Sequence, residues 1–152
     1  MKTLRNAKDK EEIERRLQKI TPSSQRQWGK MSAHQMVCHV SDAFRMYMGE
    51  KEVGQEAVPV PRPLLKWTTL WAPIPWPKGF KTAPALDQQS AGSAPRDFDV
   101  DTQELRELLH RFCAIQGSFQ WPAHPHFGRM SETEWMRLAY LHTSHHLRQF
   151  GA

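Results

Sequence analysis

The sequence has only two cysteines in 152 residues, Cys38 and Cys113, and they lie far apart in the chain. Two cysteines so placed form neither a disulfide scaffold nor a Cys-x-x-Cys metal knuckle. Both fall in segments with helical patterning, where a buried thiol is the common state of a free cysteine. We therefore expect two buried, reduced thiols.

Long apolar runs are also missing. No stretch approaches the roughly 20 residues of a membrane-spanning helix, and no apolar segment follows the basic residues that begin the chain. With 39% hydrophobic and 24% charged residues, the composition is that of an ordinary globular protein. We expect one domain over residues 1–152, located in the cytoplasm, with no membrane partner.

Acidic residues are fewer than basic ones, and the resulting net charge of +5 lies within residues 1–30. A basic first helix can contact nucleic acid or an acidic surface. Here, however, opposite charges are spaced four residues apart, as in Glu11 and Arg15, which is typical of a solvated helix face. No aromatic residue lies among these cations to stack on bases. We expect no nucleic-acid partner.

Four amphipathic helices are predicted from the spacing of apolar residues and from capping signals. The second and fourth each begin with a capping box, formed by Ser32 with Gln35 and by Ser131 with Glu134. The third is expected to begin after Asp101 and to end before a glycine. The predicted ranges are 9–20, 32–49, 102–116 and 131–150.

Residues 51–100 have a different character, because eight of the eleven prolines fall there. The segment 64–71 permits a short helix, which the prolines that follow must end. Three tryptophans, Trp67, Trp71 and Trp76, indicate packing rather than disorder and are expected to line a pocket. The sequence thus predicts an all-α protein, a four-helix bundle with one long Pro- and Trp-rich crossover between its second and third helices.

Two histidines lie four residues apart in the last predicted helix. On a helical wheel, His142 and His146 lie in the middle of the apolar face, whereas His145 is about 80° away and is not expected to be a ligand. Their spacing stacks the two imidazoles on one face, where they can bind one cation. The alternative is that each ring hydrogen bonds to a carbonyl or a buried water.

A third histidine, His39, lies towards the edge of the inward face of the second predicted helix. Three protein ligands with open positions are the catalytic arrangement for zinc, and nickel or iron accept the same ligands. Asp42 and Gln149 are within sequence reach of the outer imidazole nitrogens as hydrogen-bond acceptors. Cys38 lies about 100° from His39 on the wheel, so we do not expect it to be a nucleophile.

The segments around these histidines resemble the DinB-like (YfiT-like) metal-dependent superfamily. The resemblance rests on Gln-Met-Val-Cys-His-Val-Ser-Asp-Ala at 35–43 and on His142-x-x-x-His146 followed by Leu-Arg-Gln. The stretches 75–79, 124–131 and 145–151 are similar to a bacterial subgroup catalogued only as a domain of unknown function.

The resemblance implies a divalent metal, often zinc or nickel, held by His39, His142 and His146, and in many members a homodimer. Characterised members of the superfamily include thiol-dependent S-transferases and a maleylpyruvate isomerase, which use low-molecular-weight thiols. We therefore expect a metal-dependent transferase or hydrolase-type enzyme that acts on a small molecule, with a low-molecular-weight thiol as a candidate co-substrate.

Two alternatives to an enzyme remain at this point. One is a bundle that binds a small molecule or a metal without turnover, and the other is a decayed site whose histidines are structural. His124 and His126, just before the last helix, are candidates for a catalytic acid or base. The alternative for these two residues is a loop anchored by Pro125 and Phe127.

Overall fold

The computed structural model describes residues 1–55, 57–79 and 82–152. Over these residues the protein is all-helical, with five α-helices, one 3₁₀ turn and no strand, so the predicted all-α class is confirmed. None of the described helices is both long and apolar enough to cross a membrane. The helices are α1 (Ala7–Leu17), α2 (Ala33–Tyr47), α3 (Arg62–Trp71), α4 (Phe98–Ala114) and α5 (Glu132–Gln149), and the 3₁₀ turn is η1 (Pro84–Leu86).

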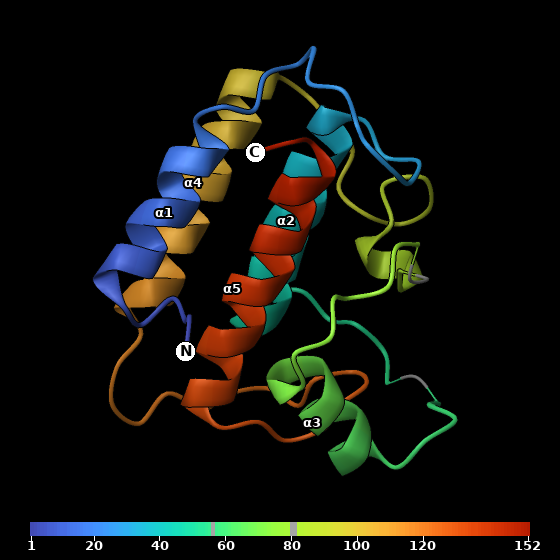
Figure 1. Cartoon of the computed structure of the whole chain (residues 1–152), viewed down its shortest axis with the longest axis vertical. Coiled ribbons are helices and arrows are strands. Elements are labelled where there is room, and N and C mark those ends of the chain that lie inside the picture. The colour runs from blue at the N-terminus through green and yellow to red at the C-terminus, as the bar shows by residue number, and fades with distance from the viewer. Residues whose placement is uncertain (56, 80–81) are drawn as a thin grey trace.

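The four longest helices form the body of the molecule (Figure 1). Helix α2 packs against both α4 and α5, and α1 packs against α5. Helices α2 and α4 run in one direction, while α1 and α5 run in the opposite one (Figure 1). Because α2 and α4 are parallel, the chain between them must return along the body. This crossover carries α3, which packs on α5, and η1, which packs on α2.

Local capping explains where α2 and α5 begin. The Ser32 hydroxyl accepts from the backbone N–H of Gln35, whose side chain accepts from the backbone N–H of Ser32. Ser131 and Glu134 form the same reciprocal pair. Each pair satisfies two backbone donors that a helix start leaves without intrahelical partners. Both predicted capping boxes are therefore confirmed.

The predicted start of α4 is wrong by one turn. The helix begins at Phe98 and is capped by Asp97, whose side chain accepts from the backbone N–H of Val100. Asp101 lies inside the first turn, where its buried carboxylate binds Arg96 and His34. The Asp101 side chain is used in these contacts and does not cap the helix, whereas the Asp97 side chain does.

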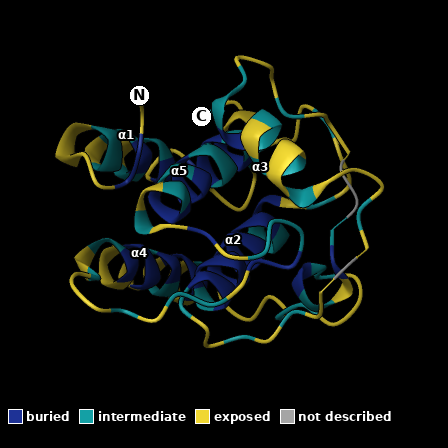
Figure 2. Cartoon of the chain, turned by 90° about the horizontal axis from the view of Figure 1, so that it is seen from below, coloured by how far each residue is buried: buried dark blue, intermediate teal, exposed yellow. Residues whose placement is uncertain are grey.

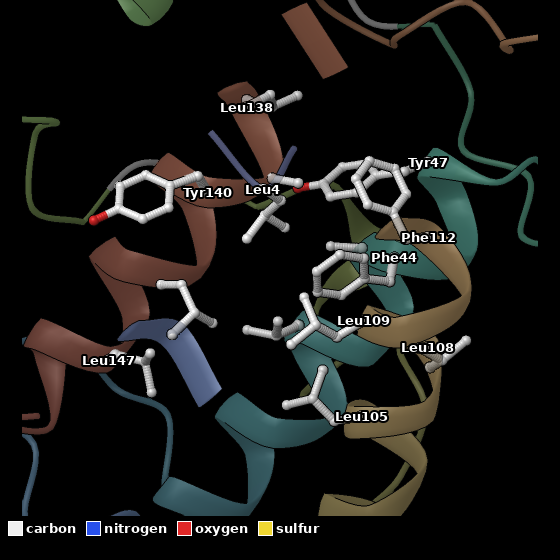
Figure 3. Close-up of a cluster of buried hydrophobic side chains, with 14 of the residues drawn as sticks. Leu4, Phe44, Tyr47, Leu105, Leu108, Leu109, Phe112, Leu138, Tyr140 and Leu147 are labelled. Atoms are coloured by element: carbon white, nitrogen blue, oxygen red, sulfur yellow. The ribbon is translucent and has the colours of Figure 1, made fainter. Parts of the chain in front are cut away.

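Aromatic side chains pack together where α2, α4 and α5 meet. Phe44 and Tyr47 of α2 lie against Phe112 of α4 (Figure 3), with ring centroids 5.3 Å apart for Phe44 and Phe112. Trp135 of α5 lies 5.3 Å from the Tyr47 ring. Complete burial of each such side chain contributes roughly 1.5–3 kcal/mol.

The buried faces of the helices turn towards one another, while α3 exposes much of its surface (Figure 2). Tight aromatic packing holds the Tyr47 ring in place, and with it a hydroxyl that reaches towards α5.

Candidate metal centre

Three histidines from two helices converge on one point. His39 lies in the middle of α2, and His142 and His146 lie one turn apart on α5. The Nε2 atom of His142 lies 3.2 Å from Nε2 of His39 and 3.1 Å from Nε2 of His146. One nitrogen from each ring lies within 4.8 Å of the other two. The structure thus brings together the three residues that the sequence singled out.

The outer nitrogen of each ring, Nδ1, contacts an oxygen atom of the protein. Two of these oxygens come from side chains and one from the backbone of η1. The three pairs are His39 with the Leu86 carbonyl at 2.8 Å, His142 with the Tyr47 hydroxyl at 3.0 Å and His146 with the Gln149 side-chain oxygen at 3.0 Å.

These partners determine which nitrogens carry protons. A carbonyl only accepts, so Nδ1 of a neutral His39 must donate to Leu86. The Gln149 amide nitrogen donates to the Trp28 carbonyl at 2.8 Å, which turns its oxygen to His146 as an acceptor. The Nε2 atoms of His39 and His146 therefore each carry a lone pair and no proton. Both face Nε2 of His142. A proton on Nε2 of His142 would have to be shared between these two acceptors, whereas a cation accepts all three lone pairs.

Burial keeps the three rings neutral. It is the main cause that lowers the pKa of His39 below its ordinary value, against a smaller opposing effect of the Leu86 carbonyl. Burial together with the neighbouring histidines lowers the pKa of His142 and of His146 well below 6.5. A neutral imidazole is the form that binds a metal ion.

The spacing of the nitrogens fits a small divalent cation. Zinc with tetrahedral geometry and nitrogen ligands at 2.0–2.1 Å holds those ligands about 3.3 Å apart. Two of the three separations, 3.2 Å and 3.1 Å, are close to this value, and the third, between His39 and His146, is within 4.8 Å. Three protein ligands would leave at least one position for a water or a substrate atom.

A second cluster with ligand-type atoms, formed by His34, Cys38 and Asp101, is much less suitable. The Asp101 carboxylate is already bound by the Arg96 guanidinium at 2.8–3.0 Å and by Nε2 of His34 at 2.8 Å. Burial raises the pKa of the Cys38 thiol to about 12, with the Asp101 charge adding to the shift. The cluster is an ion-pair network with a protonated thiol beside it.

A cavity of about 770 Å³ opens onto the three histidines. Its walls are mainly apolar, and its aromatic side chains come from several segments of the chain. Trp76 lies with its ring centroid 6.2 Å from that of His142, and its indole N–H donates to the Thr69 carbonyl at 2.9 Å. The other aromatic walls are Trp28, Tyr47 and Phe127. A cavity of this size and character suits a small organic molecule.

Comparison with known families covers nearly the whole chain. A family model described as "Protein of unknown function (DUF1569)" matches residues 6–152. The chain belongs to the DUF1569 family. No curated protein and no solved structure matches it. The matched range includes all three clustered histidines and every residue that lines the cavity.

Gln149 of this DUF1569 domain depends on a close approach by the loop before α2. Gly29 has a φ of +79°, and a Cβ atom there would lie 2.5 Å from the Gln149 amide nitrogen. Glycine permits both the left-handed backbone conformation and the contact. The loop can then offer the Trp28 carbonyl to Gln149, which in turn orients His146.

Asp42 does not contact an imidazole nitrogen, contrary to the sequence expectation. Its buried carboxylate binds the backbone and side chain of Ser93, together with Lys51 and Arg45. Asp42 therefore anchors the crossover to α2 instead. The role expected of it belongs to Leu86 and Tyr47. The contact of the Leu86 carbonyl could not be predicted from a pattern of side chains. For Tyr47, the sequence indicated only a position in the core.

Only one of the three predicted pocket tryptophans, Trp76, lines the cavity. Trp67 is 57% exposed. The Trp71 ring faces Arg137, whose guanidinium carbon lies 6.0 Å from the ring centroid. Helix α3 turns Leu65, Thr68 and Thr69 to the cavity, so Trp67 faces away. Trp28, which the sequence did not single out, takes a place in the wall.

His124 and His126 both line the cavity of the DUF1569 domain. His124 is buried, and its Nδ1 accepts from the backbone N–H groups of His126 and Phe127, at 3.1 and 3.3 Å. Burial lowers the pKa of His124 to about 3. Its lone pair is thus already in use, and the ring is a poor proton acceptor near pH 7. A role for His126 as acid or base stays a prediction.

Proposed function

We propose that this DUF1569 protein is a divalent-metal-dependent enzyme of the DinB-like type, built on a four-helix bundle. Zinc or nickel would bind His39, His142 and His146. The observation that carries the proposal is the convergence of three Nε2 atoms whose Nδ1 atoms all have oxygen partners. Fixed tautomers of this kind are characteristic of histidines that ligate metals.

The reaction class is transfer or hydrolysis on a small molecule. A divalent cation would lower the pKa of a thiol or water at its open position and so supply a nucleophile at neutral pH. The protein holds the three rings through Leu86, Tyr47 and Gln149. The apolar walls formed by Trp28 and Trp76 orient the carbon skeleton of the substrate and exclude bulk water.

The nucleophile comes from outside the chain. Cys38 does not line the cavity, and its thiol donates to the carboxylate of Asp101 in α4. With a pKa raised to about 12, this thiol is protonated at neutral pH. A low-molecular-weight thiol or a water molecule therefore fits the proposed reaction, with the thiol as co-substrate.

A second candidate function is binding without turnover. The observation in its favour is the largely apolar cavity, which can hold a small molecule whether or not chemistry follows.

The homodimer that the resemblance implies is part of the first proposal, and sedimentation equilibrium measures it directly.

The first experiment is elemental analysis of the purified protein together with a zinc titration. We expect one zinc per chain, and a His142→Ala variant whose affinity is at least about 100-fold weaker. His145→Ala is the matched control, because this neighbouring ring lines the cavity without belonging to the cluster. Full metal occupancy in His142→Ala, with an unchanged circular dichroism spectrum, would contradict the ligand assignment.

The second experiment separates the enzyme from the binding protein. Conjugation of glutathione or cysteine to monochlorobimane is followed by fluorescence, with metal-loaded protein and with protein treated with a chelator. The proposal expects turnover that the chelator abolishes and added zinc or nickel restores. Zinc-loaded protein that binds the reagents without turning them over supports the second candidate.

A further inference from the structure

His124 lies on a tight turn that comes just before α5. The backbone N–H of His124 donates to the Gly128 carbonyl at 2.8 Å, and the N–H of Gly128 donates back at 2.9 Å. Gly128 has a φ of +68°, which glycine adopts without strain. The turn therefore holds the His124 backbone firmly at the wall of the cavity.

The tautomer of His124 follows from its own turn. Two backbone N–H groups, those of His126 and Phe127, point at Nδ1 and require a lone pair there. A neutral ring must then carry its proton on Nε2. This N–H has no hydrogen-bond partner among the described residues, and His124, which is 7% exposed, lines the cavity. The Nε2 atom keeps some contact with solvent, so a molecule that fills the cavity can reach its N–H group.

The ring is also fixed in orientation. It stacks on Phe127 with centroids 4.3 Å apart and an interplanar angle of 14°, and its centroid lies 5.6 Å from that of Trp135. Trp135 in turn contacts Tyr47, whose hydroxyl reaches His142. Packed aromatic rings therefore link His124 to the histidine cluster, and both line the cavity.

We propose that the Nε2–H group of His124 donates a hydrogen bond to a carbonyl oxygen of the small molecule that occupies this cavity. The inference rests on the proposed function only in taking the cavity as the substrate site. A neutral donor among apolar walls suits an uncharged carbonyl, because a carboxylate buried there would lose most of its hydration. The aromatic walls favour a planar, unsaturated carbon skeleton next to that oxygen.

His124 thus becomes a substrate-binding group rather than the acid or base that its position first indicated. Burial lowers its pKa to about 3, so the ring stays uncharged across the physiological range. A fixed donor of this kind also stabilises negative charge that develops on a carbonyl oxygen during nucleophilic attack.

Two probes of nearly equal shape test the inference. Acetophenone carries a carbonyl where α-methylstyrene carries a methylene group. Binding of each probe is followed by the fluorescence of the tryptophans that line the cavity. We expect the wild-type protein to prefer acetophenone by a factor of about five to ten, and His124→Phe to lose this preference and bind the two probes equally.

Phe127→Leu is the matched control, because it loosens the stacked ring but keeps the donor. A purely structural role for His124 predicts that both variants lose the carbonyl preference, whereas the binding role predicts that only His124→Phe does. An equal affinity of the wild-type protein for the two probes, or no binding of acetophenone, would overturn the inference.

An independent measurement does not depend on how a variant folds. Long-range ¹⁵N–¹H correlation spectra of the wild-type protein report which nitrogen of His124 is protonated, and we expect Nε2–H at pH 7. An Nδ1–H ring or an imidazolium would refute the assignment. All binding experiments are run with and without added zinc. A carbonyl preference in protein that binds no zinc contradicts the metal centre alone, and zinc binding without the preference contradicts the His124 assignment alone.

Discussion

The side-chain oxygen of Gln149 lies 3.0 Å from Nδ1 of His146, so a residue outside the histidine cluster sets the orientation of one of its rings. The Gln149 amide nitrogen donates to the Trp28 carbonyl, and its backbone carbonyl accepts from the N–H of Gln27 at 2.7 Å. One glutamine therefore joins the loop before α2 to the end of α5. The position of the His146 ring depends on that junction.

Replacing Gln149 with leucine is expected to weaken zinc binding by about 10- to 100-fold, the usual effect of losing an acceptor behind a metal-ligating histidine. Leucine fills a similar volume but leaves Nδ1 of His146 without its acceptor. Competition against a fluorescent zinc chelator measures the change. Gln89→Leu is the control, because this glutamine lines the cavity but does not contact the histidines. Equal affinities of Gln149→Leu and the wild-type protein would show that the contact does not support metal binding.

Removal of the Tyr47 hydroxyl is expected to lower zinc affinity about tenfold, because Nδ1 of His142 loses its oxygen partner. The ring stays packed among Phe44, Phe112 and Trp135, so the free energy of unfolding should fall only by the cost of leaving Nδ1 of His142 without a partner, about 1–3 kcal/mol. Zinc titration and urea unfolding measure the two quantities for Tyr47→Phe.

The chain has only one other tyrosine, which provides a matched control. The hydroxyl of Tyr140 donates to Glu12 at 3.2 Å, away from the cluster. Tyr140→Phe should leave zinc affinity unchanged. If both tyrosine variants lose affinity equally, the effect comes from altered packing rather than from the contact to His142.

Features that depend on one helix could be predicted from the sequence. The capping boxes at Ser32 and Ser131 involve partners three residues away, and His142 and His146 share a face because of their spacing on one helix. Gln149 falls under the same rule, since it lies three residues after His146.

Features that depend on the path of the crossover could not be predicted. The Leu86 carbonyl reaches His39 only because η1 packs on α2, and backbone atoms leave no trace in side-chain patterns. Asp42 lies three residues after His39, but Ser93 and Lys51 from the crossover bind its carboxylate. The exposure of Trp67 follows from which side of α3 faces the body. The spacing of residues along one helix does not determine these tertiary contacts.

Acid should destabilise the protein through Asp101. Burial opposes ionisation of this carboxyl, but hydrogen bonds from Arg96 and His34 lower its pKa from 3.8 to about 2. A carboxyl whose pKa is lower in the folded state stabilises that state above the unfolded pKa and loses the effect as pH falls towards the folded pKa. The difference corresponds to about 2 kcal/mol, lost between about pH 4 and pH 2.

Urea unfolding at pH 6, 4 and 2 measures this loss. Asp101→Asn should be less stable than the wild-type protein at pH 6, and the difference should shrink towards pH 2, where the wild-type carboxyl becomes protonated. Asp99→Asn, in the same turn of α4, is the comparison variant. A constant difference between Asp101→Asn and the wild-type protein at every pH would contradict the assigned cause.

The two thiols are expected to be unreactive in the folded protein. Burial raises the pKa of Cys38 to about 12 and that of Cys113 to about 11, so at pH 8 at most about one Cys38 thiol in 10⁴ is ionised. Ellman's reagent should therefore label neither cysteine within minutes in buffer and both in urea. Cys113→Ser isolates the signal of Cys38, and Cys38→Ala should keep the zinc affinity and any thiol-transfer activity of the wild-type protein. Rapid labelling of native Cys113→Ser would contradict the buried, protonated state of Cys38. Loss of activity in Cys38→Ala with zinc still bound would instead place the nucleophile within the chain, because an exogenous thiol needs neither cysteine.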